Sequence, residues 1–271
     1  MGNSIFSLER VAFSYEKNAS EKLFDNLTLD IQGGVITTLI GANGSGKSTF
    51  FKLLTKNAAP QAGKVFLEGE DLSNIRLSQL AKRVAVVHQH NTAPADLAVE
   101  QLVEYGRFPH RKIRRTARLE EDERMVAWAL EVCDLQELAR KSIASLSGGQ
   151  LQRVWIALAL AQGTKILLLD EPTSFLDIRY QIDLLELIQR LNREEQMSIV
   201  MVLHDINQAL QYSDEIVALS QGAIVGKGKP AEILTSELLQ EVYGVNLEIA
   251  QFEGIPYVLT RKVECEPSAQ L

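Results

Sequence analysis

The chain has 271 residues, of which 46% are hydrophobic and 23% are charged. This length and composition predict one large globular domain, or two closely joined ones, with a substantial hydrophobic core. The formal net charge of -7, from 28 basic and 35 acidic residues, argues against a protein whose whole surface binds nucleic acid.

Export and membrane insertion are not indicated by the sequence. The longest apolar run, residues 154–161, is well short of the ~20 residues of a membrane span. The N-terminal MGNSIF contains no basic segment followed by an apolar stretch, and Phe6 stands where a myristoylation signal requires Ser or Thr. Cys133 and Cys265 have neither metal-ligand nor redox-motif spacing. We therefore expect a chain of a reducing cytosol without a disulfide framework.

Two kinds of strand are predicted in the first part of the chain. Residues 5–15 and 23–31 alternate apolar and polar side chains, which predicts half-buried antiparallel strands. Short apolar runs separated by helical stretches follow, and they are typical of a parallel sheet covered on both faces. These runs are residues 35–40, 64–69, 83–88, 165–170 and 198–204.

The middle of the chain has a different pattern. No comparable strand occurs between residues 89 and 145, where residues 99–106 and 121–135 have helical spacing instead. We therefore predict a single α/β domain over residues 1–271, with a helical subdomain inserted into its core. Residues 90–145 form the predicted insertion, and the core with its antiparallel β subdomain comprises residues 1–89 and 146–271.

Two further stretches complete the predicted organisation. Residues 215–229 and 246–260 suggest hairpins with a helix between them, and no internal repeat is visible. Residues 107–118, RFPHRKIRRTAR, are rich in Arg and Lys and are followed by EEDE. Acidic residues in the first turn of a helix complement its dipole. We therefore favour a solvated loop leading into an ordinary helix over a nucleic-acid site.

The glycine-rich stretch GANGSGKST begins the predicted chemistry. Residues 41–48 match G-x-x-x-x-G-K-[ST] between a predicted strand and a predicted helix, which is the context of a P-loop. Its backbone N–H groups close around phosphates, Lys47 reaches the β and γ phosphates, and Ser48 offers a hydroxyl to Mg²⁺. The alternative is a glycine-rich turn without a ligand.

Two carboxylates follow the apolar run ILLL. A parallel strand would deliver Asp170 and Glu171 to the edge of the phosphate loop. An Asp at this point holds the metal in P-loop NTPases. Glu171 is then the natural general base for a water that attacks the γ phosphate.

A second anion site is predicted far along the chain, in ASLSGGQLQRVWIALALA. Ser147, Gly148 and Gly149 stand at the start of an apolar helix, followed by Gln150. An exposed helix N-terminus with free amides and about half a positive charge binds anions well. Such a helix start suits a γ phosphate, although the P-loop of the same chain already holds that phosphate from one side.

Together these motifs resemble those of the ATP-binding subunits of ABC transporters over nearly the whole chain. In that family GANGSGKST is the Walker A motif, LSGGQ the signature and ILLLDE the Walker B motif. The resemblance implies that Tyr15 stacks on adenine, that Gln89 is the Q-loop glutamine, that SFLD with Asp177 is the D-loop, and that His204 is the switch histidine. The implied ATP-binding residues are Tyr15, Gly41, Asn43, Gly44, Ser45, Gly46, Lys47, Ser48 and Thr49.

The resemblance also implies a metal and a catalytic set. Mg²⁺ would be held by Ser48, Gln89 and Asp170, whereas Glu171, His204 and Gln89 would act in ATP hydrolysis. Taken singly, Tyr15 fits a simple strand-edge aromatic, and Gln89 and His204 fit satisfied polar side chains at strand ends. Their order along the chain favours the functional roles.

The implied partners follow from the same resemblance. The family signature docks on the nucleotide of a partner chain, so one P-loop and one signature per chain imply a head-to-tail homodimer with two ATP molecules. A membrane permease is expected to dock near residues 89–110, against the alternative of ordinary surface loops. A periplasmic or lipoprotein substrate-binding protein would act indirectly. The chain would lie peripherally on the cytoplasmic face of the cell membrane, without nucleic acid.

Several stretches resemble the ATPases of iron-siderophore, haem and cobalamin importers. They are VEQLVEYGRFPH, DEPTSFLDIRYQIDLLELIQRLN, VLHDINQAL and GKPAEILTSELLQEVYGV. Phe175, where many ABC proteins have a small residue, fits the ferric-siderophore subgroup. His88 and Ala98 depart from a common Pro and a common Thr of the family, and both lie near the expected docking surface.

We therefore predict import of a ferric siderophore, with haem or cobalamin as alternatives. A soluble ABC ATPase of translation or DNA maintenance is a further alternative. Such proteins usually have two fused cassettes, coiled-coil insertions or strongly basic regions, and the sequence shows none of these. A P-loop kinase or GTPase would leave the signature without a purpose.

Overall fold

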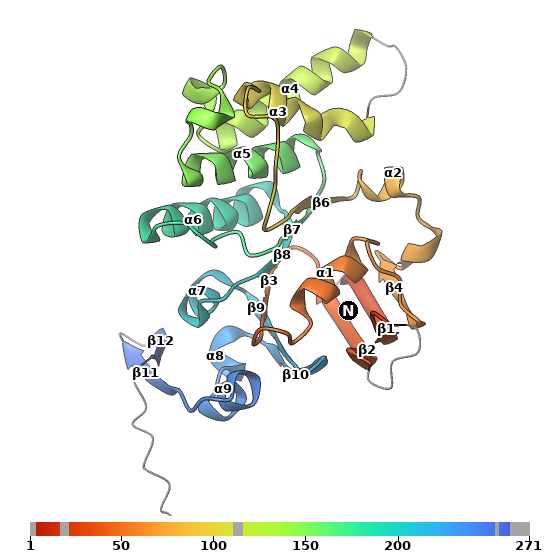
Figure 1. Cartoon of the computed structure of the whole chain (residues 1–271), viewed down its shortest axis with the longest axis vertical. Coiled ribbons are helices and arrows are strands. Elements are labelled where there is room, and N and C mark those ends of the chain that lie inside the picture. Colours follow the sequence, from red (N-terminus) through yellow and green to blue (C-terminus); the bar gives the residue numbers. More distant parts are fainter. Residues whose placement is uncertain (1–3, 17–21, 111–115, 253–254, 261–271) are drawn as a thin grey trace, which may run out of the picture.

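The computed structural model describes residues 4–16, 22–110, 116–252 and 255–260 (Figure 1). These residues form a four-stranded sheet, a six-stranded sheet and a two-stranded hairpin, with helices around them. The predicted α/β class with an antiparallel N-terminal sheet is confirmed. Cys133 is a buried free cysteine, whereas Cys265 lies outside the described residues.

The first sheet is antiparallel. Strand β1 (Ser4–Phe13) lies between β2 (Phe24–Gln32) and β4 (Ala62–Leu67), and β5 (Glu70–Asp71) pairs with β4 at the edge. The prediction that residues 64–69 belong to the parallel sheet was therefore wrong. Val65 and Leu67 are buried but Lys64 is exposed, the one-faced pattern of an antiparallel strand, and the apolar run is too short to reveal this.

The second sheet positions the motifs. Its strand order is β10-β9-β3-β8-β7-β6, and all neighbours are parallel except β9 and β10. The strands are β3 (Ile36–Ile40), β6 (Val84–Val87), β7 (Ile166–Leu169), β8 (Ser198–Val202), β9 (Glu215–Ser220) and β10 (Ala223–Gly228). The carboxyl ends of β3, β8, β7 and β6 all meet at one edge, where ligands bind in open α/β sheets.

Two hydrophobic cores flank this sheet. Helix α1 (Lys47–Leu54) buries Phe50 and Leu54 between the two large sheets, in a cluster with Phe6 of β1 and Leu39 of β3. The other face is covered by α5 (Gly148–Ala161) and α6 (Ile178–Glu195), which bury their apolar stripes against β7 and β8. The helices therefore cover both faces of the parallel strands, as their continuous apolar character requires.

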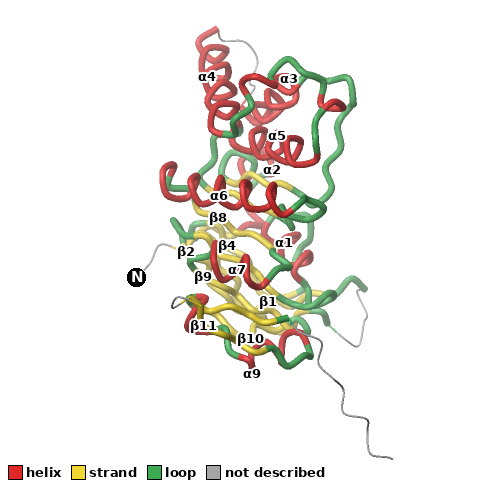
Figure 2. Tube along the Cα trace, turned by 90° about the vertical axis from the view of Figure 1, so that its left-hand side faces the viewer, coloured by secondary structure: helices red, strands yellow, loops and turns green. Residues whose placement is uncertain are grey.

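A helical layer lies at one end of the molecule in both views (Figures 1 and 2). Helices α3 (Val99–Glu104) and α4 (Thr116–Val132) pack there against α5, with 3₁₀ turns at Tyr105–His110, Gln136–Leu138 and Ile143–Ser145. Helix α5 also contacts β6 and α6, so it packs on both the helical layer and the core. The predicted boundary between the inserted subdomain and the core, at residues 145 and 146, stays a prediction.

The basic stretch is not simply a solvated loop. The side chain of Arg107 is 3% exposed, and its Nε lies 2.6 Å from Asp122 Oδ1. Its Nη1 donates to the carbonyl of Ala161 at 2.8 Å. Arg107 thus joins a 3₁₀ turn, α4 and the end of α5, so the solvated-loop prediction was wrong at this residue. Residues 111–115 of the stretch lie outside the described residues.

The C-terminal part packs its helices against β9 and β10, at one side of the second sheet. The predicted hairpins are β9–β10 and β11 (Glu248–Phe252) with β12 (Ile255–Leu259), separated by α8 (Pro230–Ile233) and α9 (Ser236–Tyr243). Asn207 of α7 (Ile206–Tyr212) anchors β12, because its side chain donates to the Val258 carbonyl at 3.1 Å and accepts from the Val258 N–H at 2.8 Å.

One further helix, the short α2 (Leu77–Leu80), precedes β6. Among the described residues, no helix is both long and apolar enough to cross a membrane.

We predict that Arg107→Leu lowers the free energy of unfolding by about 3 kcal/mol, because it leaves Asp122 and the Ala161 carbonyl without their partner inside the helical layer. Urea unfolding followed by circular dichroism measures the change. Arg140→Leu is the matched control, since Arg140 is exposed and its removal should change stability by less than about 0.5 kcal/mol. Equal effects of the two substitutions would contradict a structural role for Arg107.

Candidate active site

Two glycines of the loop between β3 and α1 are required by close contacts. A Cβ on Gly41 would lie 2.5 Å from the Leu219 carbonyl oxygen, and one on Gly46 would lie 2.7 Å from the Phe24 ring. Gly46 also has φ 110° at the N-cap of α1, a conformation that glycine adopts readily. The backbone can therefore curl tightly before the helix, which leaves the first N–H groups of α1 available to an anion.

Two hydrogen bonds to carbonyls of the loop hold the Lys47 side chain over it. Its Nζ donates to the carbonyls of Gly41 at 2.7 Å and Ala42 at 3.0 Å. Burial lowers the pKa of Lys47, and the charges of Glu171 and Asp170 act in the opposite direction. An ammonium has three donors, so one N–H remains for a phosphate oxygen.

Asp170 follows β7 and shares a pocket with Ser48. Its backbone N–H donates to the Val87 carbonyl at 2.9 Å, which fixes it beside the end of β6. Burial, and then the charge of Glu171, raise the pKa of Asp170, whereas His88, Lys47 and His204 oppose the rise. The ionised carboxylate is thus short of compensating positive charge.

The donor set fits Mg²⁺. Ser48 and Asp170 both present oxygen atoms to one pocket, and Mg²⁺ prefers oxygen ligands. No group of three or more His, Cys, Asp and Glu side chains forms a metal cage among the described residues. This suits a cation bound through one or two protein oxygens together with substrate phosphates and water.

Glu171 is the meeting point of several predicted residues. His204 Nε2 lies 2.6 Å from its Oε1, and Gln89 Nε2 donates to its Oε2. Ser174 Oγ donates to the same Oε2 at 3.2 Å. Glu171 itself has φ 51°, in the left-handed region that is costly for a residue with a side chain. The strained backbone and three side chains therefore fix one orientation of this carboxylate.

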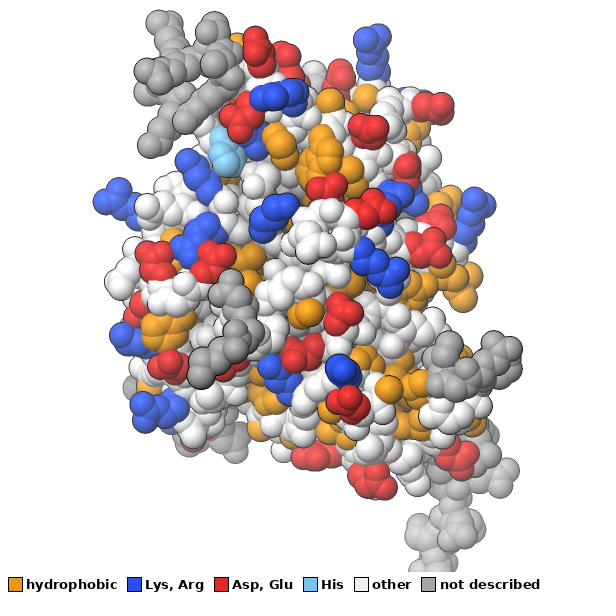
Figure 3. All heavy atoms as spheres, turned by 180° about the vertical axis from the view of Figure 1, so that it is seen from behind, with side chains coloured by type: hydrophobic (Ala, Val, Ile, Leu, Met, Phe, Trp, Pro, Cys, Tyr) orange, Lys and Arg blue, Asp and Glu red, His pale blue; other side chains and the backbone are white. Residues whose placement is uncertain are grey.

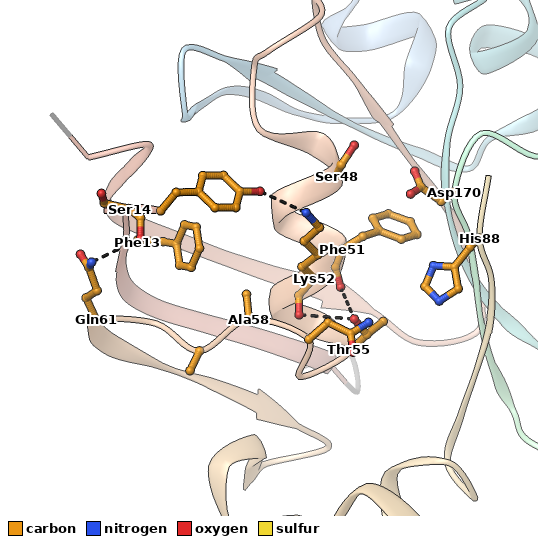
Figure 4. Close-up of a pocket in the computed structure, with 13 residues that line it drawn as sticks. Phe13, Ser14, Ser48, Phe51, Lys52, Thr55, Ala58, Gln61, His88 and Asp170 are labelled. Atoms are coloured by element: carbon orange, nitrogen blue, oxygen red, sulfur yellow. Dashed lines mark hydrogen bonds between the residues drawn. The ribbon is translucent and has the colours of Figure 1, made fainter. Parts of the chain in front are cut away.

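Tyr15 also lines this pocket, in which Phe13 and Ser14 lie far from His88 and Asp170 (Figure 4). The pocket has a volume of about 530 Å³ and extends from Tyr15 along one face of α1 to His88 and Asp170. The Tyr15 hydroxyl is 2.8 Å from Thr49 Oγ1, and this hydrogen bond is the main cause that lowers the pKa of Tyr15. Lys52 Nζ stands 5.3 Å from the ring centroid. Adenine stacking on the exposed ring stays a prediction.

The LSGGQ residues lie elsewhere. None of Ser147, Gly148, Gly149 and Gln150 lines the pocket of Ser48 and Asp170. Ser147 caps α5, where its Oγ accepts from the Gln150 N–H at 3.3 Å while Gln150 Oε1 accepts from the Ser147 N–H at 3.0 Å. This capping box orders the helix start. The signature residues and Ser48 therefore do not line one common pocket in the described chain.

The SFLD segment, residues 174–177, is exposed at its aromatic residue. The Phe175 side chain is 87% exposed and has φ 64°, and its ring stacks on His90 at a centroid distance of 6.1 Å. Asp177 is the N-cap residue of α6 but makes no side-chain capping bond.

Some site residues were missed by the sequence analysis. Ser174 stands three residues after Glu171, a spacing at which a hydroxyl can bond back to the carboxylate. Tyr243 of α9 gave no signal, because it lies two hundred residues after the P-loop in sequence. Burial raises its pKa to about 12, and the nearby Gly41 backbone opposes the rise.

The chain is similar to proteins that are already characterised. The sequence profile described as ABC transporter matches residues 24–174. The iron(3+)-hydroxamate import ATP-binding protein FhuC of Bacillus subtilis is 42% identical over 90% of this chain and 89% of its own length. The ferric enterobactin transport ATP-binding protein FepC of Escherichia coli is 45% identical over 87% of each chain.

Solved structures agree with these relatives. A structure described as an inward-facing metal-chelate type ABC transporter superposes with a TM-score of 0.79 and 29% identity, covering 95% of this chain and 96% of that chain. The dimeric post-hydrolysis state of the ATP-binding cassette MJ0796, bound to ADP and Pi, superposes with a TM-score of 0.71 and 29% identity, covering 83% of this chain and 98% of that one.

We predict that Asp170→Asn raises the thermal midpoint of the chain without nucleotide or metal at neutral pH. The raised pKa means that ionised Asp170 destabilises the folded state at pH values above the ordinary Asp pKa. The gain should shrink as the pH falls and disappear below about pH 4, where the carboxyl is protonated in both the folded and the unfolded chain. Scanning fluorimetry across pH measures this, with exposed Asp177→Asn as control. A midpoint below wild type at pH 7 would contradict it.

Proposed function

The chain belongs to the ABC transporter family as an ATP-binding subunit that hydrolyses ATP, and we propose that its transporter imports an iron chelate of the ferric-siderophore class. The observation that carries the chemistry is the convergence of His204, Gln89 and Ser174 on Glu171, next to Asp170 and Lys47. The cargo proposal is supported by the names of the relatives in Bacillus subtilis and Escherichia coli.

Glu171 acts in this proposal as the general base. Its fixed carboxylate accepts a proton from the water that attacks the γ phosphate of ATP, a role worth about 10²–10⁴ in rate. Gln89 and His204 hold the carboxylate, and Lys47 places its remaining N–H on the phosphate. When bound, Mg²⁺ would be held by Ser48 and Asp170, with Gln89 nearby, and would neutralise charge on the phosphates.

A homodimer would complete each site. Ser147, Gly148, Gly149 and Gln150 lie at an open helix start outside their own chain's pocket, so they fit an ATP bound to a partner chain. A head-to-tail pair would then hold two ATP molecules at its interface, with Asp177 of each SFLD segment beside it. The superposition on a dimeric cassette bound to ADP and Pi supports this arrangement.

The remaining partners belong to the membrane. We place the permease on residues 89–110, where Tyr105 and Phe108 are exposed and stack at a centroid distance of 5.1 Å. The ATPase would then lie peripherally on the cytoplasmic face of the membrane, and a periplasmic or lipoprotein binding protein would reach it only through the permease.

The surface charge supports a partner other than nucleic acid. Basic and acidic side chains are interspersed on the face of the molecule in Figure 3, so this face has no continuous basic patch.

We predict that Glu171→Gln lowers the ATPase kcat by about 100-fold or more, since the amide cannot accept the proton. ATP-dependent dimers should persist and become easier to detect by size-exclusion chromatography with light scattering. Ser147→Ala should instead weaken the dimer more than it weakens ATP binding to the monomer. Unchanged turnover of Glu171→Gln would remove Glu171 from the role of base.

The cargo requires the whole transporter. The ATPase and a permease that copurifies with it should be reconstituted in liposomes and tested with ferric siderophores, haem and cobalamin. Stimulation and uptake with a ferric siderophore alone would support the proposal, whereas a response to haem or cobalamin would select that alternative. Copurification with ribosomes or DNA in place of a permease would favour a soluble ATPase.

A further inference from the structure

Two glutamine side chains join the SFLD segment to helix α7. Gln181, in the first turn of α6, donates from Nε2 to the Leu176 carbonyl at 2.9 Å and to the Thr173 carbonyl at 3.4 Å. Gln208 of α7 donates from its Nε2 to Gln181 Oε1 at 2.6 Å. This pair, the amide bridge, therefore links two elements that the sequence separates.

The direction of the amide bridge is fixed by its partners. Only the NH₂ group of Gln181 can bond two backbone carbonyls, so its Oε1 must face Gln208. Gln208 must then present its own NH₂ group, which leaves its Oε1 buried and without a hydrogen bond from the described residues. An orphaned buried acceptor is unfavourable, and it persists here as a consequence of the bridge.

Both ends of the amide bridge lead back to Glu171. On one side the Gln208 N–H donates to Asp205 Oδ1 at 3.2 Å, and Asp205 directly follows His204, whose Nε2 is 2.6 Å from Glu171 Oε1. On the other side Ser174 lies between the two carbonyls that Gln181 holds, and its Oγ donates to Glu171 Oε2. The two sides of the catalytic carboxylate are thus connected through the glutamines.

We propose that Gln181 and Gln208 are positioning residues for ATP hydrolysis. The amide bridge makes the SFLD segment and the turn that carries His204 move as one unit, so that Ser174 and His204 hold the two oxygens of Glu171 together. Neither glutamine touches the substrate in this proposal, which rests on the role proposed above for Glu171. A shift of the SFLD segment on dimer formation would reach His204 through this pair.

The kinetic test uses Gln208→Met in the full-length chain, alone and with its permease. Met keeps the length but cannot donate, so kcat should fall about three- to tenfold, as expected for the loss of one neutral hydrogen bond, with KM for ATP unchanged. The thermal midpoint should stay near wild type, because the orphaned Oε1 of Gln208 is removed while Gln181 Oε1 loses its donor, so the number of unpaired amide oxygens does not change. A merely structural role would lower the midpoint and leave kcat unchanged.

The chain offers a matched control. Gln189 of α6 donates to the Gln211 carbonyl of α7 at 3.4 Å, so it joins the same two helices away from the SFLD segment. Gln189→Met should therefore have wild-type kcat. Gln181→Met combined with Gln208→Met should be no slower than Gln181→Met alone, because both substitutions remove one connection.

Hydrogen exchange tests the connection without reference to activity. In Gln208→Met, the amides of residues 173–177 should exchange faster although Gln208 does not contact them, whereas Gln189→Met should leave them unchanged. Wild-type exchange at residues 173–177 together with wild-type kcat in Gln208→Met would overturn the proposal. Glu171→Gln in the same assay separates this proposal from the role of Glu171. If Glu171→Gln is inactive, wild-type behaviour of Gln208→Met overturns only the role of the amide bridge. If Glu171→Gln is active, Glu171 is not the general base, and the proposed function itself is contradicted.

Discussion

The order of three parallel strands determines where the chemistry lies. Strand β8 runs between β3 and β7, with Leu39 paired to Val202 and Leu169 paired to Met201. The residues that follow β8 therefore emerge between the phosphate loop and the two carboxylates that follow β7. This is where His204 contacts Glu171, so the sheet topology alone brings together side chains that lie far apart in the sequence.

The same edge concentrates charge that the fold does not fully compensate. Lys47 is buried with a lowered pKa, and Asp170 is half-buried with a raised pKa, although the two charges attract each other. Each group is thus disfavoured in its ionised form by burial, which outweighs the partner's charge. Phosphates and a cation would supply the missing counter-charges. The ionised forms of Lys47 and Asp170 therefore lower the stability of the empty site, and bound phosphates and a cation would restore it. Such a loss of stability is a common property of functional sites.

Local motifs were predictable because their chemistry is contained in a few consecutive residues. The loop of residues 41–48 and the start of α5 at Ser147 are each marked by a run of consecutive residues, so the sequence revealed their position. Pairings across the fold were not predictable. The partner of β4, the ion pair of Arg107 with Asp122 and the proximity of Tyr243 to the Gly41 backbone depend on how distant elements pack.

The geometry of α5 would allow its start to bind a partner chain's nucleotide, as proposed above, without loss of its own order. Ser147 Oγ accepts a hydrogen bond from the Gln150 N–H, which uses an acceptor of the hydroxyl and leaves its O–H donor for a phosphate. Gly149 packs directly on α6, because a Cβ at that position would lie 2.6 Å from the Tyr180 ring. The start of α5 is therefore locked to the start of α6, which the SFLD segment enters. A partner's nucleotide that binds Ser147 would act on this segment, and hence on the surroundings of Glu171, through contacts that already exist in the single chain.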